Sequence, residues 1–242
     1  MAVPNLTTAS YPDLYAHLEG IVEAIHSHHN LPRSAHLDEE GHLDALRRIA
    51  ASKSWASDVD AIDGELGRRI TEAGEATRSA LAALTARPTG SDAVAAELRA
   101  TRFWQRTASV LDAETAASRP GAALVLVETV AAEDLATVLE ELPSYLASRG
   151  VREIGGVDTE QRIEEALYRR LPRLGDAKRN EAHAQTMRSA FARMLGFIRE
   201  STADINAPML APVGVLKLAQ VRAIDERHQV KGGPARRPDR AA

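Results

Sequence analysis

Apolar residues recur along most of this chain at the three- and four-residue spacing of helices that bury one face. The clearest stripe has successive spacings of 3, 4, 4, 3, 4, 4 and 3 residues, and its positions are Val59, Ile62, Leu66, Ile70, Ala73, Thr77, Leu81 and Leu84. Such an 11-residue repeat has a period of about 3.67 residues per turn, which predicts a long, nearly straight helix. We therefore expect one helix over residues 55–86.

A second long helix is predicted directly after the first one. Residues 87–90, Arg-Pro-Thr-Gly, break the pattern, and a suitable N-cap serine opens a helix over residues 91–118. Two long helices joined by a short turn form an antiparallel hairpin, here over residues 55–120. We expect the second arm to pack on the first through one broad face, made of Val94, Leu98, Thr101, Trp104, Ala108 and Leu111. Phe103 and Val110 lie on another side of this arm, so they predict a contact with a further partner.

The segment at residues 121–157 has a different pattern of apolar residues, in which they follow one another in short runs. Residues 124–130, Leu-Val-Leu-Val-Glu-Thr-Val, are rich in β-branched side chains and predict a buried strand. Residues 151–154 predict a second, parallel strand after an intervening helix, which gives a small βαβ-like insertion near residues 122–156. The alternative is a buried helix over residues 122–142, because a short apolar run does not reveal its own period. The fold would then be all-α.

Helical spacing also appears on both sides of these segments. Residues 1–54 predict an N-terminal pair of helices, at residues 12–28 and 37–52, and residues 158–230 predict C-terminal helices. One C-terminal helix has an apolar face made of Met187, Ala190, Met194 and Ile198. Residues 231–242 contain no apolar anchor, so they predict a disordered basic tail. The predicted fold class is therefore mainly α, with the long antiparallel helical hairpin inside a helical bundle.

Composition supports the helical interpretation and excludes several classes of site. The chain has 44 Ala but only nine aromatic residues, which suits closely packed helices, and it has no Cys for disulfides, thiolate zinc sites or cysteine nucleophiles. The net charge of −4 is unevenly distributed, with −6 over residues 1–45, +1 over residues 46–120, −6 over residues 121–160 and +7 over residues 161–242, and such a polarity can steer surfaces together. No apolar run approaches the ~20 residues of a membrane span. With no secretory signal either, we expect a cytoplasmic protein that does not contact a membrane.

Histidines concentrate near the N-terminus, where six of the eight lie within the first 42 residues. Glu23 with His26, and Glu39 with His42, have the Glu-x-x-His spacing by which helices of di-iron bundles supply two ligands to a buried metal pair. These four residues are weak metal candidates, and the alternative is an acidic, histidine-rich surface helix pair. The common nucleotide-binding, zinc-protease and nucleophile-elbow motifs are absent, so we assign no catalytic or cofactor-binding residue and expect no cofactor.

The specific features of the sequence are thus contact surfaces rather than reactive groups. We expect a non-enzymatic protein–protein interaction, assembly or structural protein that also associates with itself as a homo-oligomer, with interface residues Phe103, Val110, Met209 and Leu210. The alternative is a metal-binding helical protein or metal-dependent enzyme that uses the N-terminal His/Glu cluster. A third interpretation, binding of nucleic acid through the basic C-terminal third, ranks lower because acidic residues interleave with the arginines.

Overall fold

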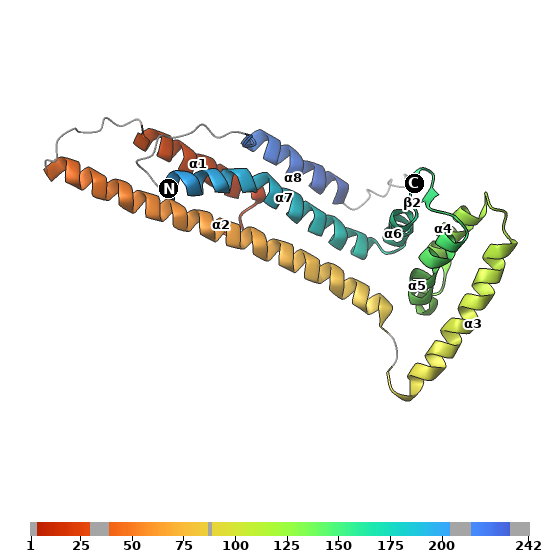
Figure 1. Ribbon diagram of the computed structural model, residues 1–242. Helices are drawn as coiled ribbons and strands as arrows, with labels where there is room; N and C mark the ends of the chain where they lie inside the picture. Colours follow the sequence, from red (N-terminus) through yellow and green to blue (C-terminus); the bar gives the residue numbers. More distant parts are fainter. Residues whose placement is uncertain (1–3, 30–38, 87–88, 204–213, 233–242) are drawn as a thin grey trace, which may run out of the picture. The chain divides into compact units, whose positions relative to one another are not determined.

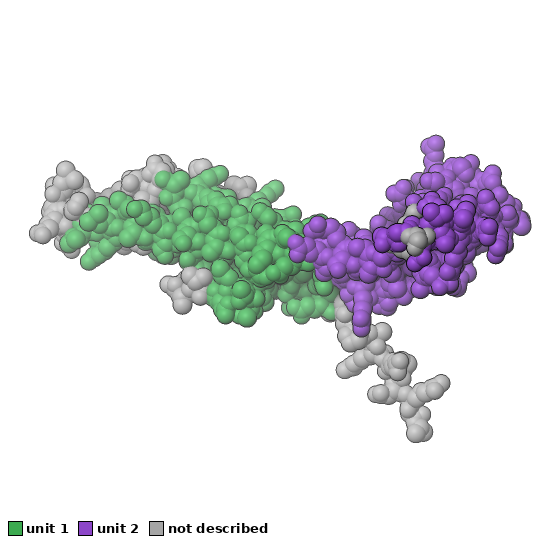
Figure 2. Space-filling model, turned by 90° about the horizontal axis from the view of Figure 1, so that it is seen from below, with its two compact units in different colours: residues 1–73, 179–242 green, residues 74–178 purple. Residues whose placement is uncertain are grey.

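The computed structural model is built almost entirely of helices (Figure 1), which confirms the mainly α fold class. The structure describes residues 4–29, 39–86, 89–203 and 214–232. Within these ranges no helix has the length and apolar content to cross a bilayer. The elements form two units, coloured separately in Figure 2: unit 1 contains residues 1–73 and 179–242, and unit 2 contains residues 74–178.

The described residues of unit 1 form four helices around one core. They are α1 (Tyr11–His29), the first part of α2 (Glu39–Thr85), most of α7 (Pro172–Ala203) and α8 (Leu218–Gly232), which lie alongside one another in Figure 1. The buried core residues are Leu14, Tyr15, Leu18, Ile21, Ile25, Val59, Ile62, Leu66, Met187, Phe191, Met194, Leu195, Ile198 and Val221. Complete burial of one such side chain contributes about 1.5–3 kcal/mol, so this cluster is the main source of stability in unit 1.

The predicted stripe of α2 is confirmed where it faces this core. Val59, Ile62 and Leu66 are at most 1% exposed, and they share the cluster with residues of α1, α7 and α8. The predicted boundary between residues 37–52 and 55–86 is wrong, because α2 continues through it without interruption. Neither Pro nor Gly stands at this boundary, and the hydroxyl of Ser52 donates to the Ile49 carbonyl at 3.0 Å within the helix.

Unit 2 contains the remaining elements. In chain order they are α3 (Ser91–Ala113), α4 (Arg119–Thr129), α5 (Ala132–Ser148), β1 (Glu153–Ile154), β2 (Val157–Asp158) and α6 (Thr159–Arg170). In the core of this unit α4 packs on α6, and α3 packs on α5. The buried residues are Leu111, Ala123, Val127, Val130, Leu135, Val138, Leu142, Leu146, Ile163, Ala166, Leu167 and Leu174.

The predicted βαβ insertion does not form. Residues 124–130 belong largely to helix α4, which begins at a proline-containing first turn and buries Ala123 and Val127, one helical turn apart, while Val125 is exposed. The apolar run thus forms a helix, and the residues that it buries are those that face α6. Residues 153–154 do form a strand, but it pairs antiparallel with β2 rather than with residues 124–130.

Glycines determine how α5 ends and how the small hairpin turns. Gly150 has φ of 76°, and the N–H of Val151 and of Gly150 donate to the carbonyls of Leu146 and Ala147 at 3.0 Å each. This is the Schellman motif expected for a glycine just past a helix end. Gly155 and Gly156 also have positive φ, which a two-residue hairpin turn requires.

Candidate functional site

The four candidate metal ligands do not form a described site. Glu23 and His26 lie on α1 and are exposed, and Glu39 and His42 lie at the start of α2, where their side chains are outside the described residues. Among the side chains that the structure describes, no group of three His, Asp or Glu is arranged to hold a metal ion. The metal site at these four residues stays a prediction.

The expected interface residues lie in different places. Phe103 is half-buried on α3 and packs against the core of unit 2, whereas Val110, two helical turns further along, is 66% exposed. Met209 and Leu210 fall outside the described residues. The described residues of the predicted contact surface therefore lie on helix α3.

Helix α3 is fixed on α5 by its other side. Trp104 and Leu111 contribute to the core, and the Trp104 ring meets the Tyr145 ring edge-on with the two centroids 5.8 Å apart. At the C-terminal end Asp112 accepts hydrogen bonds from the Tyr145 hydroxyl at 2.7 Å and from the Arg149 guanidinium at 2.8 Å. Both interactions join the C-terminal end of α3 to the C-terminal end of α5.

Two expectations about α3 need correction. It ends at Ala113 rather than at residue 118, and the Arg119 side chain donates to the carbonyls of Leu111 and Glu114 at this end, both at 3.0 Å. The predicted packing of this face on the first hairpin arm is also wrong, since α3 packs on α5 and α4, and Val94 and Leu98 are more than half exposed. Only the Trp104 and Leu111 end of that face is packed, and its partners are α5 and α4.

The exposed side of α3 carries a regular row of side chains. Leu98, Arg102, Arg106 and Val110 follow one another at four-residue intervals, so successive members lie one helical turn apart and the row extends about 18 Å. The two apolar ends of the row are 53% and 66% exposed. Phe103 lies beside the row. We call these five residues the α3 surface.

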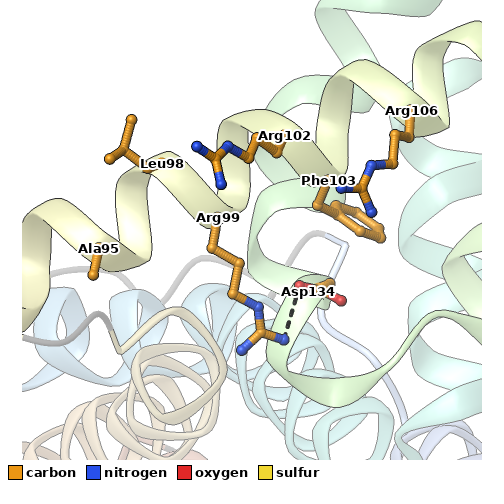
Figure 3. A pocket seen from close by; sticks show the side chains of 7 residues that line it. All are labelled: Ala95, Leu98, Arg99, Arg102, Phe103, Arg106 and Asp134. Atoms are coloured by element: carbon orange, nitrogen blue, oxygen red, sulfur yellow. Dashed lines mark ion pairs between the residues drawn. The ribbon is translucent and has the colours of Figure 1, made fainter.

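A shallow cleft of about 540 Å³ lies along this surface, lined by Ala95, Leu98, Arg99, Arg102, Phe103, Arg106 and Asp134 (Figure 3). Arg99 forms ion pairs with Glu133 and with Asp134, the latter at 3.6 Å. The Glu133 hydrogen bond raises the pKa of Arg99 further above its ordinary value. In Figure 3 Arg102 and Arg106 extend from the same helix without reaching a labelled carboxylate.

Arg102 and Arg106 differ from most arginines of this chain. Across residues 4–29, 39–86, 89–203 and 214–232, the structure gives neither guanidinium an ion pair or a hydrogen bond. By contrast, Arg162, Arg169, Arg188 and Arg199 from the basic C-terminal third all form ion pairs with carboxylates. The two guanidinium groups of α3, one helical turn apart on its exposed side, are thus available to an external partner.

A second cluster of titratable groups lies in unit 1, where α7 meets α8. The rings of His183 and His228 stack with centroids 4.0 Å apart, and Nε2 of His183 is 2.9 Å from an oxygen of the buried Asp225. Nε2 of His228 is 3.0 Å from the Asn180 amide oxygen. Burial, and next the neighbouring His183, lower the pKa of His228 below its ordinary 6.5, although Asp225 opposes this shift.

This cluster predicts that unit 1 loses stability in mild acid. Because the folded-state pKa of His228 is lowered, the unfolded chain binds the proton first as the pH falls through about 6.5. The free energy of unfolding should therefore decline below this pH. Measured by denaturant titration at pH 7.5 and 5.5, the decline should be smaller in His228→Gln, and an identical decline in both proteins would exclude this role for His228.

The comparisons with known proteins assign no relative to this chain: no family model, curated protein or solved structure matches it.

Proposed function

We propose that this chain is a protein-interaction module that binds another protein through the α3 surface. The proposal rests on Arg102 and Arg106, which have no ion-pair partner in the described parts of the chain and lie between two exposed apolar side chains. The opposite side of their helix packs on α5. Arginine and aromatic side chains are enriched in protein interfaces, and apolar contacts within an interface exclude water from the charged groups. A role as an assembly component or adaptor follows from such a surface.

Within the chain itself, these side chains contribute little to the free energy of folding. An exposed leucine and an exposed valine bury little apolar area, and an unpaired arginine gains no Coulomb energy from a fixed partner. Covering the row would bury both apolar ends and supply acceptors to both guanidinium groups. All these gains come from one contact.

Site-specific photo-crosslinking in cells tests the proposal. A photoreactive amino acid replaces Leu98 or Val110, and in a matched control it replaces Val125, a 56% exposed residue of α4 in the same unit. We expect one discrete protein adduct at both α3 positions and none at the α4 position. The adduct is then identified by mass spectrometry, and an adduct of twice the chain mass indicates a second copy. No adduct at the α3 positions, or equal adducts at all three, would contradict the proposal.

A further inference from the structure

The α3 surface has a charge and a spacing that indicate what kind of partner segment it accepts. Resting on the proposed function, we infer that the partner segment is an acidic amphipathic helix. Two of its carboxylates, one helical turn apart, face Arg102 and Arg106, and apolar side chains one turn beyond each carboxylate contact Leu98 and Val110.

The sign of the partner's charge follows from the cations that remain unpaired. Arg99 is already paired with Glu133 and Asp134, so it is occupied within unit 2. Arg102 and Arg106 keep their full donor capacity, and a guanidinium forms its strongest protein contacts with carboxylates, to which it can donate two parallel hydrogen bonds. A partner that brings two carboxylates satisfies both groups.

The spacing of the row favours a helix as the partner. Leu98, Arg102, Arg106 and Val110 form a ridge at four-residue intervals, and such ridges interdigitate with the same kind of ridge on a second helix. Acidic residues at i and i+4 of that helix repeat at about 6 Å, the same repeat as the two arginines. A helix also satisfies its own backbone groups, whereas a strand would find no sheet edge on α3 to pair with.

The apolar ends of the row argue against a phosphate backbone as the occupant. A nucleic acid would use the two arginines but would leave Leu98 and Val110 without apolar contacts, and it would approach the carboxylates of Glu133 and Asp134 beside Arg99. An acidic helix with flanking apolar residues uses all four members of the row. Nucleic acid is therefore an alternative for the experiment to detect.

The inference is tested with designed peptides against the full chain. Three labelled, alanine-based helical peptides each carry four designed positions at four-residue intervals. The two outer positions are Leu in every peptide, and the two inner positions are both Glu, both Gln or both Lys. Fluorescence anisotropy measures their affinity for the wild-type chain, for R102E/R106E and for R102Q/R106Q. The control R152E/R173E reverses two other exposed arginines of unit 2 for which the structure also gives no side-chain partner.

We expect the Glu peptide to bind the wild-type chain and R152E/R173E equally, and to lose at least about tenfold in affinity on R102E/R106E, which corresponds to about 1.4 kcal/mol. R102Q/R106Q should lose less, because it removes attraction without adding repulsion. The Gln peptide should bind the wild type weakly. The Lys peptide should regain affinity for R102E/R106E, a gain that also shows this variant to be folded.

Several results would overturn the inference. If the Glu peptide fails to bind while crosslinks at Leu98 and Val110 persist, the partner is not an acidic helix and the proposed function stands alone. If those crosslinks are absent too, the proposed function fails with it. A single-stranded RNA oligonucleotide that binds in an Arg102- and Arg106-dependent way and displaces the Glu peptide would assign the surface to nucleic acid. A dimer that dissociates on R102E/R106E and excludes the peptide would assign it to a second copy.

Discussion

Replacing Phe191 by alanine is expected to lower the free energy of unfolding of unit 1 by about 3–5 kcal/mol. Phe191 is fully buried on α7, and its ring meets the rings of Tyr15 and Tyr11 edge-on with centroids 5.0 and 6.4 Å apart. The substitution removes the ring contacts of α7 with α1 from the core that these helices share with the α2 stripe. It also leaves a cavity that the neighbouring rings can fill only in part, which adds to the lost burial.

The two tryptophans allow this loss to be measured in one unit at a time. Trp55 packs against the unit 1 core and Trp104 against the unit 2 core, so Trp55 fluorescence in a Trp104→Phe background reports the unfolding of unit 1. Ser189→Ala, on the exposed side of α7, is the matched control and should change the free energy by less than about 0.5 kcal/mol. Equal, small changes in Phe191→Ala and Ser189→Ala would mean that the buried face of α7 is misassigned.

Arg69→Met is the second substitution expected to have a large effect, about 3 kcal/mol or more. The Arg69 guanidinium donates to the nearly buried Glu65 carboxylate at 2.7 Å and to the carbonyls of Leu6 and Ala9 at 2.9 and 2.7 Å, and it lies 4.9 Å from the centre of the Tyr11 ring. Methionine keeps much of the length of the side chain but none of these donors. The segment before α1 would lose its attachment to α2.

A double-mutant cycle with Glu65→Gln separates the ion pair from the contacts to the N-terminal segment. Arg68 contributes most, and Arg69 less, to holding the pKa of Glu65 below its ordinary 4.5. The folded chain thus keeps Glu65 ionised. The stability that Glu65 gains from its two arginine partners is therefore complete above about pH 4.5 and is lost as the pH falls further. We expect the cycle to show coupling at pH 7 and less at pH 3. Additive effects at both values would show that Arg69 acts only through the carbonyls.

Positions that repeat at a helical period over many turns could be predicted from the sequence. The stripe through Val59, Ile62 and Leu66 faces the unit 1 core, and Met187 with Ile198 does so on α7. Long periodic segments restrict their own register, because a shift would expose every apolar residue at once. Their partners were harder to predict. Val94 and Leu98 have the spacing of a packed face, yet they are exposed, because periodicity does not say which helix covers a face.

The segment at residues 124–130 was mispredicted because a short run of apolar and β-branched residues, interrupted only by Glu128, fits a strand and a buried helix equally well. The proline-containing first turn of α4 and the packing of Val127 on α6 decide for the helix. Both signals lie outside the run itself. Tertiary packing overrides the strand preference of the valines here.

The contact surface could be predicted only in part. Phe103 and Val110 were identified from their position on α3, and their helix does present exposed apolar residues. The arginines between Leu98 and Val110 were not among the predicted interface residues, because the chain has 26 arginines spread along its length. Their four-residue spacing is visible in the sequence. That both lack an ion pair in the described parts of the chain and lie between two exposed apolar side chains is a property of the fold.

The crosslinking yield at Val110 in two substituted backgrounds tests the central claim, binding of a protein by the α3 surface, most directly. Leu98→Asp places a charge at the other end of the row, and Val125→Asp places the same charge at a comparably exposed position on α4. We predict that Leu98→Asp abolishes the protein adduct at Val110, while Val125→Asp leaves its yield at the wild-type level and both variants keep the wild-type helix content. An adduct at Val110 whose yield is the same in both backgrounds would contradict the account.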